Sequence, residues 1–204
     1  MALKREGILL ILAVILLAVV IAVMVLPDAL SEVETDGVPH VLVRLLGLYG
    51  FLLLGVATLM TSFLAEVTRV FGRPFLKVHH AFSVFGIAFI TLHPVFNAVQ
   101  RLSLAVFVPS FVSWELFWML AGRPAFVMLY VALLAVFLRK KIQKYWRPFH
   151  ALMYVVLLFG IVHGNLIGED FANLGIMIIF DALFLASLAS FAYKRYLNYQ
   201  TRRE

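Results

Sequence analysis

Six long apolar runs, separated by short charged loops, divide this chain of 204 residues. A transmembrane helix needs about 20 apolar residues, because the hydrocarbon core of a bilayer is about 30 Å thick. Only 14% of the residues are charged, whereas a soluble globular domain carries about 25%. The sequence therefore predicts an all-α integral membrane protein, with a single membrane domain built as a six-transmembrane-helix bundle. The expected spans cover residues 7–26, 41–65, 78–98, 125–138, 149–167 and 171–193.

The first run is preceded by Lys4 and Arg5, as in a signal peptide. The run is too long for a typical signal-peptide core, and it lacks an evident small-residue cleavage site. We therefore expect a retained first span, closed by Pro27. An acidic loop follows it, in which we expect His40 to be solvated.

The distribution of lysine and arginine predicts the orientation. With the N-terminus inside, 14 of the 17 basic residues fall on the inner side, as the positive-inside rule requires. Both termini are then inside. Basic residues confined to short loops are a topology signal, so we expect no nucleic-acid partner. The chain has no cysteine, which excludes disulfides, thiolate metal sites, iron–sulfur clusters and cysteine nucleophiles.

The segment 103–120, between the third and fourth spans, is apolar and aromatic but interrupted by Pro109. One interpretation is a short helix in the membrane interface, where tryptophan and phenylalanine act as anchors. The other is a cap over a buried cofactor.

Four histidines lie at matched depths in the third and fifth spans, which both run outward. His79 and His93 are 14 residues apart, and His150 and His163 are 13 residues apart, so each pair spans roughly 20 Å along its helix. Ionisable side chains inside a span are costly and suggest function. The spacing predicts that His79 faces His150 near the inner side and that His93 faces His163 near the outer side. Each pair would then clamp a haem iron through its ring nitrogens.

Helical phase supports one of these histidine pairs better than the other. On an ideal helix His79 and His93 point within about 40° of each other, whereas His150 and His163 point about 140° apart. A second haem therefore requires either a distorted fifth helix, or two haems that are bound on different sides of that helix. Pro94 should kink the third span. Three glycines either give a macrocycle room or allow close helix packing; they are Gly86, Gly160 and Gly164.

Three further polar residues are candidates for the site. Arg44, near the outer end of the second span, would pair with a haem propionate or snorkel to the headgroups. Asp181 would accept a hydrogen bond from a ligand histidine or a propionate network, or be a protonated packing residue. His80 is either a spare ligand in place of His79 or a polar group at the inner surface.

Two segments carry a resemblance to a known family. The stretch KVHHAFSVFGIAFITLHP from Lys77, and WRPFHALMYVVLLFGIVHG from Trp146, are similar to the third and fifth helices of the ferric reductase-like transmembrane domains. That superfamily includes NADPH oxidases, ferric reductases and the bacterial MsrQ-type haem subunits. The resemblance implies six helices and haem b as the cofactor, with either two haems or one. His79 and His150 would ligate the inner haem, and His93 and His163 the outer one.

The resemblance also predicts partners. MsrQ-type proteins tend to lack the first histidine of the third helix, so His79 favours the two-haem arrangement. The sequence shows no flavin or nicotinamide domain and no G-x-G-x-x-G after a plausible strand. Flavin is therefore expected only through a partner or weakly bound. A cytosolic flavin reductase or a quinol would be the donor, in a prokaryotic inner membrane.

The leading functional hypothesis is outward electron transfer across the bilayer, as an oxidoreductase-type subunit. The acceptor would be ferric iron, oxygen, or an external redox protein such as a methionine sulfoxide reductase. A second hypothesis is a cofactor-free transporter or channel whose intramembrane His, Arg and Asp form an ion path. A third is a structural or assembly subunit with histidines buried for packing. The oligomeric state is not predicted.

Overall fold

The computed structural model describes residues 3–201 and divides the chain into two compact units. The first unit holds the chain up to Phe96 together with the residues from Leu185 onward, and the second holds 97–184. Two helices cross from one unit to the other, α5 (Phe75–Arg101) and α11 (Leu174–Gln200). Residues 3–201 contain helices, turns and no strand, which confirms the all-α class.

Five helical stretches are long and apolar enough to cross a membrane. They correspond to the first, second, third, fifth and sixth predicted spans and comprise Arg5–Ser31, Val38–Met60, Phe75–Arg101, Arg139–Ile167 and Leu174–Gln200. The helix at the fourth predicted span is α7 (Gly122–Phe137), with 16 residues. At 1.5 Å per residue it is about 24 Å long, shorter than a bilayer core of about 30 Å.

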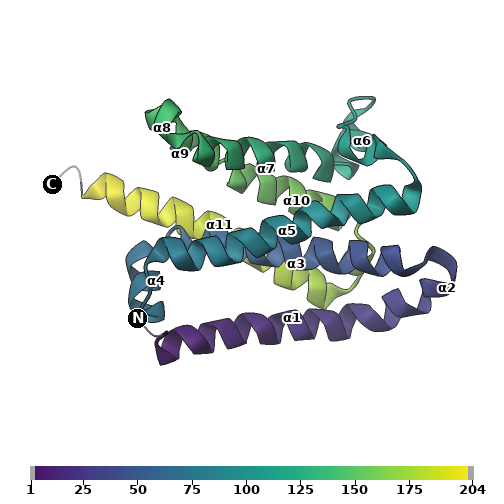
Figure 1. Ribbon diagram of the computed structural model, residues 1–204, viewed down its shortest axis with the longest axis horizontal. Helices are drawn as coiled ribbons and strands as arrows, with labels where there is room; N and C mark the ends of the chain where they lie inside the picture. The colour runs from purple at the N-terminus through teal and green to yellow at the C-terminus, as the bar shows by residue number, and fades with distance from the viewer. Residues whose placement is uncertain (1–2, 202–204) are drawn as a thin grey trace. The chain divides into compact units, whose positions relative to one another are not determined.

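In the first unit, α1 (Arg5–Ser31) runs beside α3 (Val38–Met60), as Figure 1 shows. Ile21, Val25 and Ala29 of α1 are almost completely buried, and the hydroxyl of Tyr49 donates to the carbonyl of Ala18 across the pair at 3.1 Å. Between Ile8 and Val23 every exposed residue of α1 is apolar. Burial of this kind leaves one face of the helix for its neighbours and the other for lipid.

The ends of these helices differ from the predicted ones for local reasons. α1 continues through Pro27 to Ser31, whose hydroxyl donates to the carbonyl of Asp28 at 2.7 Å. α3 ends at Met60, five residues before the predicted limit, because the polar Thr61 turns back to the Thr58 carbonyl at 2.7 Å. The short helices that follow α1 and α3 are α2 (Val33–Asp36) and α4 (Leu64–Phe71).

Helix α4 closes one end of the first unit. Its buried Val67 and Phe71 pack with Val78 of α5, and it stops at Gly72, whose φ of 63° is a left-handed conformation that suits glycine. Its polar side carries Glu66, which accepts a hydrogen bond from Lys194 of α11 at 3.1 Å. The ammonium of Lys194 also lies over the ring of Phe63, 5.2 Å from its centroid.

In the second unit, α7 packs on α10 (Met153–Ile167) and on α9 (Trp146–His150). Small and branched apolar residues fill the contact, with Ala125, Leu129 and Ala132 buried on α7. Shorter elements complete the unit, and they are η1 (Leu104–Phe107), α6 (Trp114–Met119), α8 (Arg139–Ile142), η2 (Gln143–Tyr145) and η3 (Glu169–Ala172).

Candidate functional site

His93 is held on the neighbouring helix of its own unit. Its Nδ1 lies 2.8 Å from the carbonyl oxygen of Val43 on α3. A Cβ built on Gly47, one turn further along α3, would come within 2.8 Å of the same nitrogen. The imidazole therefore fits into a notch in α3 that only a glycine leaves open, and it is half-buried there.

His79 has the same kind of anchor at the other end of α5. Its Nδ1 lies 3.1 Å from the carbonyl oxygen of Ala57, and its ring stacks on Phe75 with centroids 5.3 Å apart. The hydroxyl of Ser83 lies 3.4 Å from its Nε2. His80 is exposed, so of the two adjacent histidines His79 is the one turned toward α3.

His163 repeats this arrangement in the second unit. Its Nδ1 lies 2.8 Å from the carbonyl oxygen of Met119, the last residue of α6. A Cβ on Gly122 would lie 3.0 Å from its Cδ2 and 3.1 Å from its Nε2. The end of α6 thus supplies the hydrogen-bond acceptor, and the first residue of α7 is the glycine against which this ring packs.

The three anchored rings share one tautomer. A carbonyl oxygen only accepts hydrogen bonds, so Nδ1 must carry the proton, and Nε2 is the nitrogen with the lone pair in the neutral ring. A histidine that ligates a metal characteristically donates its other N–H to a carbonyl or carboxylate, which fixes the orientation of the ring. His79, His93 and His163 therefore have the protonation pattern of ligands that bind through Nε2.

His150 ends α9, and the helix changes its winding directly after it. Its ring interacts with the backbone of Ala132 on α7. Bonds from Leu152 to Phe149 and from Tyr154 to Ala151, both at 3.1 Å, follow the tighter i→i−3 pattern. Each such residue turns a helix by about 120° instead of 100°, so two of them reduce the 140° separation from His163 to about 100°. The fifth span is thus distorted directly after His150, but the rings of His150 and His163 still point about 100° apart.

The glycines that make room for the histidines are not those we singled out from the sequence. A Cβ on Gly86 would meet Leu54 at 2.9 Å, and one on Gly164 would meet the ring of Phe171 at 2.7 Å. Both glycines therefore serve close packing in their own units. Close packing is one of the two roles that the sequence left open for Gly86 and Gly164, whereas Gly47 and Gly122 make room for the His93 and His163 rings. No sequence signal distinguishes a glycine that faces a histidine from one that faces a leucine.

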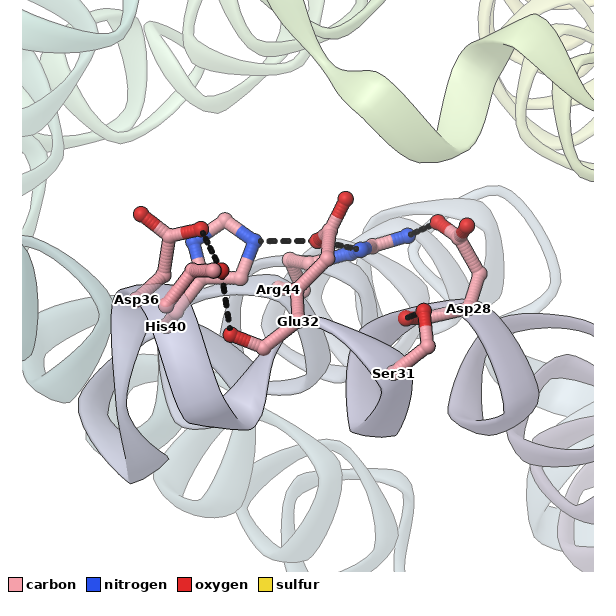
Figure 2. A network of polar contacts seen from close by, with 7 residues as sticks. Asp28, Ser31, Glu32, Asp36, His40 and Arg44 are labelled. Carbon is pink, nitrogen blue, oxygen red and sulfur yellow. Dashed lines mark hydrogen bonds and ion pairs between the residues drawn. The ribbon is translucent and has the colours of Figure 1, made fainter.

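Arg44 is the centre of a charged cluster near the N-terminal end of α3 (Figure 2). Its guanidinium donates to Asp28 at 2.7 Å and to Glu32 at 2.9 Å, while its side chain is only 6% exposed. His40, which we expected to be solvated, instead has 13% of its side chain exposed and an Nε2 that lies 3.0 Å from the same Glu32 oxygen. The cluster ties α1 to α3, and a propionate on Arg44 would have to share or displace these carboxylates.

Asp181 also has a partner within its own unit. The side-chain amide of Asn165 on α10 donates to its carboxylate at 2.9 Å and to the Ile161 carbonyl at 3.0 Å. Asn165 lies two residues from His163. The pair therefore connects α10 to α11 close to a candidate ligand, a contact that the sequence alone did not reveal.

The aromatic segment 103–120 packs on α10 at one end and is exposed at the other. Trp118 and Phe117 pack against Phe159 of α10, with centroids 5.2 and 5.9 Å apart, one turn before His163. Phe111 and Trp114 instead expose 79% and 76% of their surfaces. One end of the segment covers α10, and the other presents aromatic rings outward.

Comparison of the chain with protein-family models, with curated proteins and with solved structures gave no match.

Proposed function

We propose that this chain is a haem b membrane protein that carries electrons from an inner donor to an outer acceptor. In this proposal it crosses the bilayer six times with both termini inside, and α7 is the fourth and shortest span. The concentration of basic residues on one side supports that topology. The six spans need about 20 residues each, and α7 reaches this length only together with the turns at its two ends.

The observation that carries the proposal is the shared tautomer of three histidines. His79, His93 and His163 each direct Nδ1 to a backbone carbonyl at 2.8–3.1 Å. A histidine buried only for packing has no need of the same nitrogen, anchored in the same way, at three separate positions. The donor set of neutral imidazoles, with no cysteine in the chain, fits haem iron of the b type.

The pairing of the four histidines rests on the sequence. In the proposal His79 and His150 hold the inner haem, and His93 and His163 hold the outer one. The haems supply one-electron redox chemistry, and the protein supplies ligation, orientation and potential. An electron that moves outward gains about 2.3 kcal/mol for each 100 mV of an inside-negative potential.

The proposed electron transfer also needs a donor on the inner side and an acceptor on the outer side. A cytosolic flavin reductase or a quinol delivers the electron, and ferric iron, oxygen or an external redox protein receives it. The proposed location is the prokaryotic inner membrane.

Paired histidine variants test the proposal. His93→Ala and His163→Ala should each remove the same haem signal from the absorption spectrum of the purified protein. His80→Ala, a matched control at an exposed position beside His79, should leave the spectrum unchanged. A full spectrum in both His93→Ala and His163→Ala would show that the assignment of ligands is wrong. A colourless wild-type protein from haem-replete cells would favour the transporter hypothesis instead.

A further inference from the structure

An apolar groove runs along α7 in the second unit. Its volume is about 380 Å³, and it is lined by side chains of α7 and by one residue of η1, namely Phe126, Val127, Tyr130, Val131, Leu134 and Phe107. Four of the α7 residues, Val127, Tyr130, Val131 and Leu134, follow the i, i+3, i+4, i+7 spacing of one helix face, and Phe126 lies beside them. Phe137, which is 75% exposed, continues that face toward the end of the helix.

A dense group of cations begins two residues beyond Phe137. All five lie within the nine residues from Arg139 to Arg147, and all are exposed; they are Arg139, Lys140, Lys141, Lys144 and Arg147. No acidic residue occurs between Glu115 and Glu169. In the first unit, by contrast, the cation Lys194 has Glu66 as its partner at 3.1 Å. The five cations of Arg139–Arg147 therefore have no acidic residue near them in the sequence.

Aromatic rings accompany these cations. Lys144 lies 5.0 Å from the centroid of the Tyr145 ring, and Arg147 lies 5.6 Å from that of Trp146. Tyr145 is 55% exposed. Aromatic residues beside lysine and arginine are typical of the level of the lipid headgroups, whereas the surface for a soluble acidic protein would not need to join an apolar groove.

We propose that α7 and the segment Arg139–Arg147 together bind an anionic phospholipid. An acyl chain lies in the groove, and Phe137 lies at the end of the groove that is next to the cations. The phosphate lies among the five cations. A basic cluster directly next to a membrane helix attracts anionic headgroups with about 1 kcal/mol for each lysine or arginine, which is about fivefold in binding constant. The inference goes beyond electron transfer and does not depend on haem.

Titration of the full chain in a neutral detergent, followed by native mass spectrometry, tests this site. Phosphatidylglycerol should bind more tightly than phosphatidylcholine. The triple variant Lys140→Gln, Lys141→Gln, Lys144→Gln should weaken phosphatidylglycerol about a hundredfold. The control removes three cations from the first unit, as Arg69→Gln, Arg73→Gln and Lys77→Gln, and should have a much smaller effect.

The groove has a separate test. Val131→Trp, at a position that is 40% exposed, fills the groove and should weaken both lipids equally, while leaving the preference for the anionic one. Equal losses in the two triple variants would overturn the proposal, because they would indicate a general attraction to the inner face. Equal affinity of the wild type for both lipids would also overturn the proposal. The same holds if native mass spectrometry shows an acidic soluble protein bound to the chain where lipid is expected. The His93→Ala variant should bind phosphatidylglycerol as the wild type does, so loss of haem and loss of lipid remain distinguishable.

Discussion

Gly47→Ala perturbs a single candidate ligand through one added methyl group. The new Cβ would lie 2.8 Å from His93 Nδ1, against an ordinary contact of 3.4 Å or more. The imidazole must therefore move by about 0.6 Å, away from the Val43 carbonyl to which it is bonded at 2.8 Å. The variant should lose that hydrogen bond or bend it badly.

The magnitude follows from three contributions. A lost hydrogen bond lowers the free energy of unfolding by about 1 kcal/mol, and overpacking lowers it by about 1–3 kcal/mol. The replacement of glycine by alanine in a helix raises it by about 1 kcal/mol. We expect a net destabilisation of about 1–3 kcal/mol. The proposal further predicts a shifted spectrum or midpoint potential for the haem that His93 and His163 would hold, the proposed outer haem. Thermal unfolding in detergent and a redox titration measure the two effects.

Gly86→Ala is the matched control on the helix that carries His93. Its Cβ would meet Leu54 at 2.9 Å, so it should also destabilise the protein, but it leaves the His93 anchor intact. The reasoning would be refuted if Gly47→Ala left the outer haem unchanged, or if Gly86→Ala altered it as strongly as Gly47→Ala did.

Three other variants test separate parts of the structure. Gly122→Ala should displace the His163 ring by a few tenths of an ångström, because its Cβ would lie 3.0 Å from Cδ2, and should shift the outer haem spectrum without abolishing it. Arg44→Met should lower the stability by about 1–3 kcal/mol, because it removes charge-assisted hydrogen bonds to two carboxylates; an unchanged unfolding midpoint would contradict this. The pKa of Glu66 is lowered by its own backbone N–H and by Lys194, so its ionised form is stabilised by folding. The contribution of ionised Glu66 to the stability of the fold should be present in full above pH 4.5, the ordinary pKa of the carboxyl group. It should be lost as the pH falls through the lower pKa that Glu66 has in the folded protein. The protection factors for hydrogen exchange in Leu64–Phe71, which correct for the intrinsic pH dependence of exchange, should fall at acid pH in the wild type, and Glu66→Gln should remove this fall.

The helices could be predicted largely from hydropathy, because a bilayer imposes a minimum length on every apolar run. Their ends could not, since they depend on single contacts. Pro27 was expected to close the first span, yet α1 continues to Ser31, because one missing backbone donor does not stop a helix whose later turns are bonded. α3 ended early at Met60 for a similarly local reason.

The candidate site was predictable in its residue types and less so in its surroundings. The matched spacing of four histidines in two spans indicates them as candidate ligands, and the cost of placing ionisable side chains inside a membrane suggests that they have a function. The carbonyls of Val43, Ala57 and Met119 carry no sequence signal, because every residue has one. The partners of Arg44 were absent from the prediction for another reason. Asp28 and Glu32 belong to the acidic loop that the sequence predicts after Pro27, and the continuation of α1 beyond Pro27 brings them to the guanidinium.

The reduced-minus-oxidised absorption spectrum of the purified protein, with haem titrated against protein, tests the central claim most directly. The proposal predicts haem of the b type at two per chain, with one lost in either His93→Ala or His163→Ala. One haem per chain would contradict the inner pair of His79 and His150. No haem, in protein from haem-replete cells, would contradict electron transfer altogether.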